Sequence, residues 1–394
     1  MSPVDSHPEI GGPTAIAPRP VDKTRDWYAR VAVILLDCVL LFLFLNLVIY
    51  LIILAGRPSQ QTPLSRYGGD KILKSYPGWR AEDVETLLTE TWRKLSLGYE
   101  PFTGFREKPF RGRFVNVDRA GFRFSKDQAP WPPGREAINV FVFGGSTTFG
   151  MGLPDDQTIP SYMGKCGAEK GSRGLAVYNF GRESYFSTQE MILFLQLLNG
   201  GLVPEVAVFI DGINEFDPDH ADGQPRFAGA IRDFMDGKTG SKLPDKIPAV
   251  RAVHWLRSHW TKPQPQKVTN SADRAALEGI ISRWLANKTI IESIAKRYGV
   301  RTIFVWQPIP DYKYDLHNQP FYESTSMSDH PGYALMDNLR AQGKLGANIL
   351  WLADMQQDKQ ENLYVDRWHY NAKFSREIAG RICDCLRENL GGLR

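Results

Sequence analysis

A long apolar run near the N-terminus constrains this chain more than any other feature. The run begins at Val31, ends at Ala55 and contains one charged residue, Asp37. As a helix it would extend about 37 Å, which is enough to cross a bilayer with some tilt. A cleaved signal peptide is the alternative, but its apolar core is only about 7–15 residues long. We therefore predict a transmembrane helix over residues 31–55, preceded by a disordered tail over residues 1–30.

The basic residues on either side of this run predict its orientation. More of them precede the run than follow it: Arg19, Lys23, Arg25 and Arg30 against Arg57 and Arg66. Basic flanks are retained in the cytoplasm. We therefore expect a cytoplasmic N-terminus and an extracytoplasmic remainder, in the periplasm or at the cell surface.

Composition excludes several classes of function. The 394-residue chain is 42% hydrophobic and 23% charged, with a net charge of +4, which is ordinary for a globular protein. Its basic residues form no concentrated patch of the kind that binds nucleic acid, so we predict no nucleic-acid partner. The four cysteines match no zinc-binding spacing, and we predict neither a metal nor a cofactor.

The chain beyond the apolar run divides into two regions. Residues 56–135 are predicted to form a membrane-proximal connector, with a helix over residues 81–97 followed by short strands and turns. Residues 136–394 are predicted to form the main domain. Within it, residues 216–271 are rich in Pro, Gly and charged residues, which indicates an insertion. That insertion is either a lid over a site or a surface excursion without a role in catalysis.

The main domain alternates between strand and helix patterns. Five apolar runs of strand length occur at residues 138–143, 175–180, 206–210, 302–306 and 349–352. Helical segments are predicted near residues 157–166, 188–199, 272–298 and 372–389. Runs that are apolar on both faces suit a parallel sheet covered by helices. We therefore predict an α/β fold, a doubly wound sandwich around a five-stranded parallel sheet.

Candidate chemical groups stand where open parallel sheets form their sites, at the carboxyl ends of strands. Ser146 follows two glycines that permit a tight turn, Gly181 ends the second strand, and the Asn214 amide could donate to an oxyanion. Asp366, three residues before His369, could hold one ring nitrogen so that the other acts as a base. Each motif alone has a purely structural alternative. Their occurrence together, in this order, predicts nucleophilic catalysis.

These residues resemble the four sequence blocks of the SGNH hydrolases, also called GDSL-type esterases and lipases. The matching segments are Phe143-Gly144-Gly145-Ser146-Thr147, Asn179-Phe180-Gly181, Gly212-Ile213-Asn214-Glu215 and Asp366-Arg367-Trp368-His369. The resemblance covers roughly residues 136–390. It implies a flavodoxin-like three-layer α/β/α sandwich.

The resemblance also implies a role for each residue. Ser146 would be the nucleophile, His369 the general base and then the general acid, and Asp366 the carboxylate that orients the imidazole. The oxyanion hole would consist of the backbone N–H groups of Ser146 and Gly181 and the side chain of Asn214.

Three positions depart from the pattern of the family. The usual Gly-Asp-Ser is Gly-Gly-Ser, the usual Gly-x-Asn-Asp ends in Glu215, and Phe374 stands where a glycine often follows the histidine. None of these changes removes a catalytic group. They leave the subfamily and the substrate open rather than the type of reaction.

The sequence thus predicts a membrane-anchored serine esterase that acts through an acyl-Ser146 intermediate. Its substrate would be an acylated small molecule or polysaccharide, and we expect O-acetyl esters of an extracytoplasmic carbohydrate. Three alternatives remain: an O-acyltransferase that uses the same site, a lipase or thioesterase, and a non-catalytic subunit of polysaccharide assembly.

The cysteines of the main domain permit one covalent link. Cys166 is expected near the helix after the nucleophile, and Cys383 and Cys385 on the last helix, on the same face of the sheet. Outside the cytoplasm a disulfide from Cys166 to Cys383 or Cys385 could form. Buried free thiols are the alternative that we favour.

Overall fold

A computed structural model describes residues 23–55, 62–66, 69–166, 173–217, 220, 222–236, 247–248, 250, 274–321 and 330–390. Most of the predicted insertion 216–271 lies outside these residues, as do residues 1–22 of the predicted tail. The chain separates into two compact units, Met1–Pro58 with Ser241–Gln264 and Ser59–Gly240 with Pro265–Arg394.

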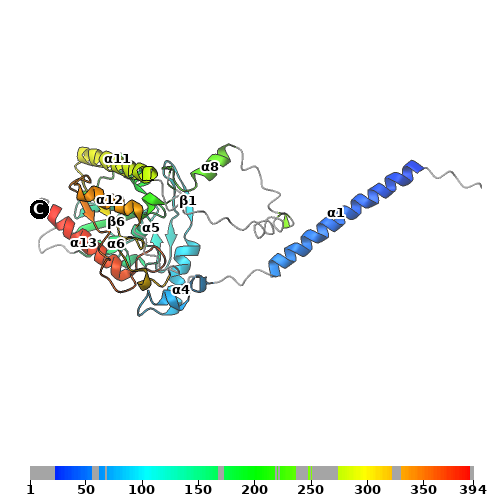
Figure 1. Cartoon of the computed structure of the whole chain (residues 1–394), viewed down its shortest axis with the longest axis horizontal. Helices are drawn as coiled ribbons and strands as arrows, with labels where there is room; N and C mark the ends of the chain where they lie inside the picture. Colours follow the sequence, from blue (N-terminus) through cyan, green and yellow to red (C-terminus); the bar gives the residue numbers. More distant parts are fainter. Residues whose placement is uncertain are drawn as a thin grey trace, which may run out of the picture. The chain divides into compact units, whose positions relative to one another are not determined.

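The first unit contains one long helix, α1 (Lys23–Ala55) (Figure 1). It is long and apolar enough to cross a membrane, and most of its large apolar side chains are exposed. The helix begins at Lys23, so residues 23–30 are helical and the prediction of a disordered tail is wrong for them. These residues contain neither Gly nor Pro, and a helix nucleated in the apolar run can propagate through them.

The second unit is built on a five-stranded parallel sheet with the strand order β6-β5-β7-β8-β9. The strands are β5 (Ile138–Gly144), β6 (Leu175–Gly181), β7 (Val206–Asp211), β8 (Arg301–Trp306) and β9 (Ile349–Trp351). All five predicted strands are confirmed, to within one residue at either end. Because β6 and β7 lie on opposite sides of β5, the winding reverses there, and the carboxyl ends of β5 and β7 form the switch point.

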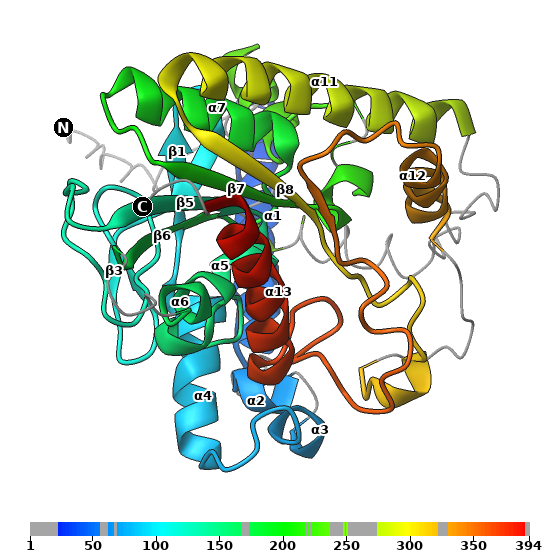
Figure 2. The ribbon, with the colours of Figure 1, turned by 90° about the vertical axis from the view of Figure 1, so that its left-hand side faces the viewer.

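Helices cover both faces of this sheet (Figure 2). One face carries α7 (Ser187–Asn199), α11 (Arg274–Tyr298) and α12 (Pro331–Ala341), and the other carries α6 (Ile159–Gly164) and α13 (Ala372–Leu390). Side chains alternate between the two cores: Phe141 and Phe143 of β5 pack under α7 and α11, whereas Val140 and Val142 pack under α6 and α13. The predicted three-layer α/β/α sandwich is therefore confirmed.

Short elements complete this unit. They are α5 (Ser146–Phe149), α8 (Ala228–Met235) and the 3-10 turns Asp155–Gln157, Ile213–Phe216 and Leu316–Asn318. Of the longer helices, α12 was not predicted from the sequence. Only Gly332, Tyr333 and Met336 are buried in it, so its apolar stripe is too sparse to stand out.

The region before the sheet belongs to the same compact unit. It contains α2 (Pro63–Arg66), α3 (Asp70–Leu73), α4 (Ala81–Thr89), a π-helical turn (Glu90–Lys94), the antiparallel pair β1 (Leu97–Glu100) and β2 (Gly104–Glu107), and the pair β3 (Phe110–Arg111) and β4 (Asn116–Val117). The predicted helix over residues 81–97 thus ends at Lys94, because Leu97 already pairs with Glu107. Buried side chains of α4 share a third core with Phe149 and Val365.

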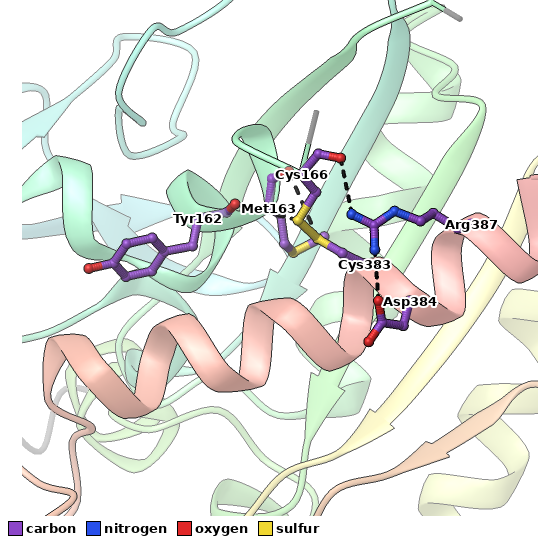
Figure 3. Close-up of a disulfide and its surroundings, with 6 residues drawn as sticks. All are labelled: Tyr162, Met163, Cys166, Cys383, Asp384 and Arg387. Carbon is purple, nitrogen blue, oxygen red and sulfur yellow. Dashed lines mark hydrogen bonds and ion pairs between the residues drawn. A yellow bond between two sulfur atoms is a disulfide. The ribbon is translucent and has the colours of Figure 1, made fainter. Parts of the chain in front are cut away.

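A disulfide joins two segments on one face of the sheet (Figure 3). Cys166, just after α6, pairs with Cys383 of α13 across a Cα–Cα distance of 6.2 Å and a sequence separation of 217 residues. Arg387 Nη2 donates a hydrogen bond to the carbonyl oxygen of Cys166 at 3.5 Å. The favoured alternative of free thiols is therefore wrong for this pair. Packing of α6 against α13 brings the two cysteines within bonding distance.

Alkylation of the full chain tests this pairing. Under denaturing conditions, iodoacetamide should modify Cys166 and Cys383 only after reduction, because their sulfurs are joined in the native protein. Cys38, which is exposed on α1, is the internal control and should react without reductant. Peptide mass spectrometry reads both outcomes, and alkylation of Cys166 before reduction would contradict the structure.

Candidate active site

The nucleophile turn connects β5 to the short helix α5. Gly144 ends the strand with a φ of +155°, a backbone angle that residues other than glycine rarely adopt. A Cβ at Gly144 would also overlap Thr148, and one at Gly145 would overlap the Asn214 amide. Ser146 then opens α5 at the carboxyl edge of the sheet.

Ser146, His369 and Asp366 form one continuous hydrogen-bonded chain. His369 Nε2 lies 2.9 Å from Ser146 Oγ, and His369 Nδ1 lies 2.7 Å from Asp366 Oδ2. The other carboxylate oxygen, Oδ1, accepts the backbone N–H groups of Trp368 and His369, each at 2.8 Å. The geometry thus brings together the three predicted catalytic residues, although 220 positions separate Ser146 from Asp366 in the chain (366 − 146).

Asp366 is held as a carboxylate. Burial acts to raise its pKa, but the charge of His369 and the hydrogen bonds from His369 and Trp368 outweigh burial, and the net pKa lies below the usual value. A carboxylate that accepts from Nδ1–H fixes the tautomer of the imidazole. The Nε2 lone pair then faces the hydroxyl of Ser146, which is the arrangement that a general base needs.

The region before the sheet contributes two aromatic residues to this site. The indole of Trp92, in the π-helical turn, lies 5.6 Å from the His369 ring between centroids. The hydroxyl of Tyr76 donates to the carbonyl oxygen of Gly152 at 2.6 Å, and burial together with the charge of Asp366 raises the pKa of Tyr76. No motif in residues 56–135 linked either aromatic residue to catalysis in the sequence.

Asn214 lies beside the nucleophile turn. It follows β7 in the 3-10 turn Ile213–Phe216, and its Nδ2 donates to the carbonyl oxygen of Tyr185 at 2.6 Å. A carboxamide nitrogen carries two N–H groups, so the second one is available for another acceptor. The geometry therefore places a side-chain donor next to Gly145.

Gly181 occupies a different role from the predicted one. Its N–H donates to Asn179 Oδ1 at 3.0 Å, so it is engaged and does not point a free donor at an oxyanion. A Cβ at Gly181 would overlap the backbone of Thr148 and Phe149, and close packing of β6 against α5 explains the glycine.

Ser184, in the loop after β6, has a backbone N–H that the sequence did not single out. It has a φ of +54°, and no described residue accepts a hydrogen bond from its N–H. Its hydroxyl accepts from Arg226 Nη1 at 3.1 Å, and the same nitrogen donates to Glu183 at 3.2 Å. In the sequence, Ser184 looks like an ordinary turn residue. No local pattern shows that its backbone adopts left-handed angles.

A buried arginine holds the nucleophile turn in place. The side chain of Arg123 is fully buried and its Nε pairs with Asp155 at 3.0 Å. Its Nη1 donates to the carbonyl oxygens of Phe149 at 2.9 Å and Gly150 at 2.7 Å, and its Nη2 donates to that of Leu153. These carbonyls end α5 and form the next turn, where no helical N–H can satisfy them. Arg123 therefore ties the region before the sheet to the nucleophile.

Three buried carboxyl groups form a cluster near Asn214: Glu190, Asp211 and Glu215. Asp211 accepts from Trp284 Nε1 at 2.9 Å, and Glu215 accepts from the N–H and Oγ of Ser187 at 2.6 and 3.1 Å. Burial raises the pKa of Asp211 to about 6. Burial and the charge of Asp211 raise the pKa of Glu215 to about 8. The pKa of Glu190 is also well above its usual value, through burial and the same two carboxylates. The cluster therefore retains protons at neutral pH.

Comparisons with known proteins found no matching family model and no matching curated protein. Solved structures do match. A gut microbial diltiazem-metabolizing enzyme shares 12% identity with a TM-score of 0.38, over 64% of this chain and 47% of the other; this chain thus spans about half the length of that protein. An acetyl xylan esterase shares 12% identity with a TM-score of 0.37, over 63% and 100%. A GDSL-like lipase from Bacteroides thetaiotaomicron shares 17% identity with a TM-score of 0.19, over 54% and 90%. At these values, any assignment of chemistry rests on the geometry of the site.

Replacement of Arg123 should destabilise the second unit. Arg123→Met removes the ion-pair partner of Asp155, which keeps only the hydrogen bonds from Asn116, and it removes the guanidinium donors of three carbonyls. Loss of one partner of a buried ion pair typically costs about 3–5 kcal/mol. Arg113→Met is the matched control, because Arg113 pairs with Asp83 on the surface, where such pairs contribute about 0–1 kcal/mol. Urea unfolding of the full chain in detergent measures both. Equal losses in the two variants would contradict the role given to Arg123.

The carboxyl cluster should make stability depend on pH. Groups whose pKa is raised by folding stabilise the protein at low pH, and that contribution is lost as pH rises through their folded pKa values. The Tm of the wild type should therefore fall between about pH 5 and about pH 8, despite the charge of Arg283, which acts to lower the pKa of Glu215. The Tm of Glu190→Gln should fall less steeply with pH, because the glutamine cannot ionise. Glu278→Gln, at an exposed position of α11, should follow the wild type.

Proposed function

We propose that this chain is a serine hydrolase of the SGNH type that cleaves acyl esters through an acyl-Ser146 intermediate. The observation that carries the proposal is the continuous contact from Asp366 Oδ2 through the His369 ring to Ser146 Oγ, at 2.7 and 2.9 Å. This chain has the residue types, the order and the distances of a nucleophile, a general base and an orienting carboxylate.

The reaction proceeds in two halves. Ser146 Oγ attacks the carbonyl carbon of the ester while its proton passes to His369 Nε2, and the imidazolium is stabilised by Asp366. His369 then returns this proton to the leaving alkoxide as the carbon–oxygen bond of the ester breaks. In the second half, water attacks the acyl-Ser146 carbonyl with His369 again accepting a proton, and the acid leaves as Ser146 Oγ regains its hydrogen.

The negative charge on the carbonyl oxygen needs donors that are already in position. The N–H of Ser146 and the free N–H of the Asn214 amide supply two of them. We assign the third to the N–H of Ser184 in place of Gly181, because the Gly181 N–H is bonded to Asn179. Gly181 supports the hole indirectly, through its packing on α5.

Anchoring and location are part of the same proposal. Helix α1 would cross the membrane with its N-terminus in the cytoplasm, and the second unit would lie outside. The disulfide between Cys166 and Cys383 supports this side of the membrane, because disulfides persist in oxidising compartments and are rare in the cytosol.

The proposed substrate follows from the resemblance to a family. O-acetyl esters of an extracytoplasmic carbohydrate remain a prediction that rests on the resemblance of the sequence blocks to those of SGNH hydrolases. Transfer of the acyl group to a sugar instead of water would use the same intermediate and the same residues.

A fluorophosphonate probe and a p-nitrophenyl acetate assay test the mechanism on the full chain. The probe should label the wild type, and Ser146→Ala should abolish labelling and hydrolysis. Asn214→Ala should lower kcat by about 10²–10³, because one oxyanion donor is lost. Asn199→Ala, at an exposed position at the end of α7, is the matched control and should keep wild-type activity. Labelling that persists in Ser146→Ala would refute the proposal.

A further inference from the structure

The second unit exposes an apolar patch next to the loop that carries Ser184. The patch, called here the hairpin–α8 patch, consists of Tyr99, Phe102, Phe227, Ile231, Phe234 and Met235. Four of these side chains are exposed by more than two thirds: Tyr99 by 72%, Phe102 by 79%, Phe234 by 71% and Met235 by 77%. Large aromatic side chains gathered at such exposure mark an interaction surface rather than a solvated one.

The two parts of the patch contact each other. Tyr99 and Phe102 belong to the β1–β2 hairpin, and a Cβ at Gly104 in that hairpin would lie 3.3 Å from the side chain of Pro225. The ring of Phe105 meets that of Phe227 edge to face at 5.4 Å between centroids. The hairpin and the start of α8 therefore form one continuous surface, and Figure 1 shows both at the same end of the unit.

Helix α8 lacks any buried residue. Phe234 and Met235 follow Ile231 by three and four positions, so these three side chains lie on one side of the helix. An isolated helix of this length is marginal in water, and its apolar side gains stability only when a partner covers it. The patch thus has the form of an amphipathic interfacial helix with an aromatic hairpin beside it.

We infer that the hairpin–α8 patch docks on the surface of the bilayer that α1 crosses. This inference rests on the proposed membrane anchoring. Only residues 56–62 lie between α1 and α2, and fully extended they reach about 25 Å, so the second unit cannot move far from the membrane. Aromatic side chains are enriched at the interface between lipid and water, and Arg226 and Arg232 beside the patch can meet lipid phosphates.

Docking in this way would orient the proposed active site. Arg226 immediately precedes the patch and holds Ser184 and Glu183. The loop that supplies the proposed oxyanion donor is therefore attached to the docked surface. The site would then face substrates presented close to the membrane rather than in bulk solution.

Lipid quenching on the full-length chain tests this inference. The chain is reconstituted into phosphatidylcholine vesicles with or without lipids that carry a doxyl quencher in the upper acyl chain. An NBD fluorophore is attached at Phe234→Cys, or at Phe102→Cys as a second patch site, in a chain with Cys38→Ser and Cys385→Ser. Val203→Cys is the control, because Val203 is exposed and lies outside the patch. Labelling of Ser146 by the fluorophosphonate probe confirms that each variant is folded.

The label at residue 234 or 102 should shift to the blue and lose most of its emission with quencher lipids, whereas the label at residue 203 should not.

A label on native Cys38, in a Cys385→Ser chain, reports on α1 separately. If the Cys38 label is quenched and both patch labels behave like residue 203, docking is wrong and the anchor stands. If no label is quenched, both proposals are wrong. A blue shift at residue 234 without quenching would assign the patch to a second copy of the chain instead.

Discussion

This site depends on the hydrogen bonds and the ion pair that the buried guanidinium of Arg123 makes. Arg123 belongs to the region before the sheet, but its N–H groups donate to carbonyl oxygens at the end of the nucleophile helix and in the following turn, and to Asp155. Burial of a charged group costs much less when its donors are satisfied, and here the carbonyls of the nucleophile turn and Asp155 accept those hydrogen bonds. These contacts explain why residues 62–128 fold as part of the same compact unit rather than as a separate connector.

Reversal of the winding at β5 then determines where the chemistry lies. The carboxyl ends of β5 and β7 adjoin, so Ser146 and Asn214 meet although they follow different strands. His369 reaches the same edge from a turn whose ends are joined by a hydrogen bond from the Val365 N–H to the His369 carbonyl oxygen at 2.8 Å. The Trp92 ring lies beside the imidazole. Three separate segments thus converge on one nucleophile.

Three features bear on the surroundings proposed for this unit. Helix α1 has the length and composition of a membrane span, the Cys166–Cys383 disulfide suits an oxidising compartment, and the hairpin–α8 patch offers an aromatic surface for the interface. All three features are consistent with the proposal that the second unit is held close to the outer side of a membrane.

The sequence alone determined what local patterns can encode. Runs of apolar residues specified α1 and the five strands, and glycine, asparagine and histidine at strand ends specified the positions of Ser146, Asn214 and the Asp366–His369 pair, because periodicity and turn chemistry act over a few residues. Only the tertiary structure decided which distant groups meet. Packing between elements determines four such contacts. They are the hydrogen bonds of Arg123 to the nucleophile turn, the contact of Trp92 with His369, the pairing of Cys166 with Cys383, and the hydrogen bond that engages the Gly181 N–H. Such packing is set by the whole core rather than by any short segment.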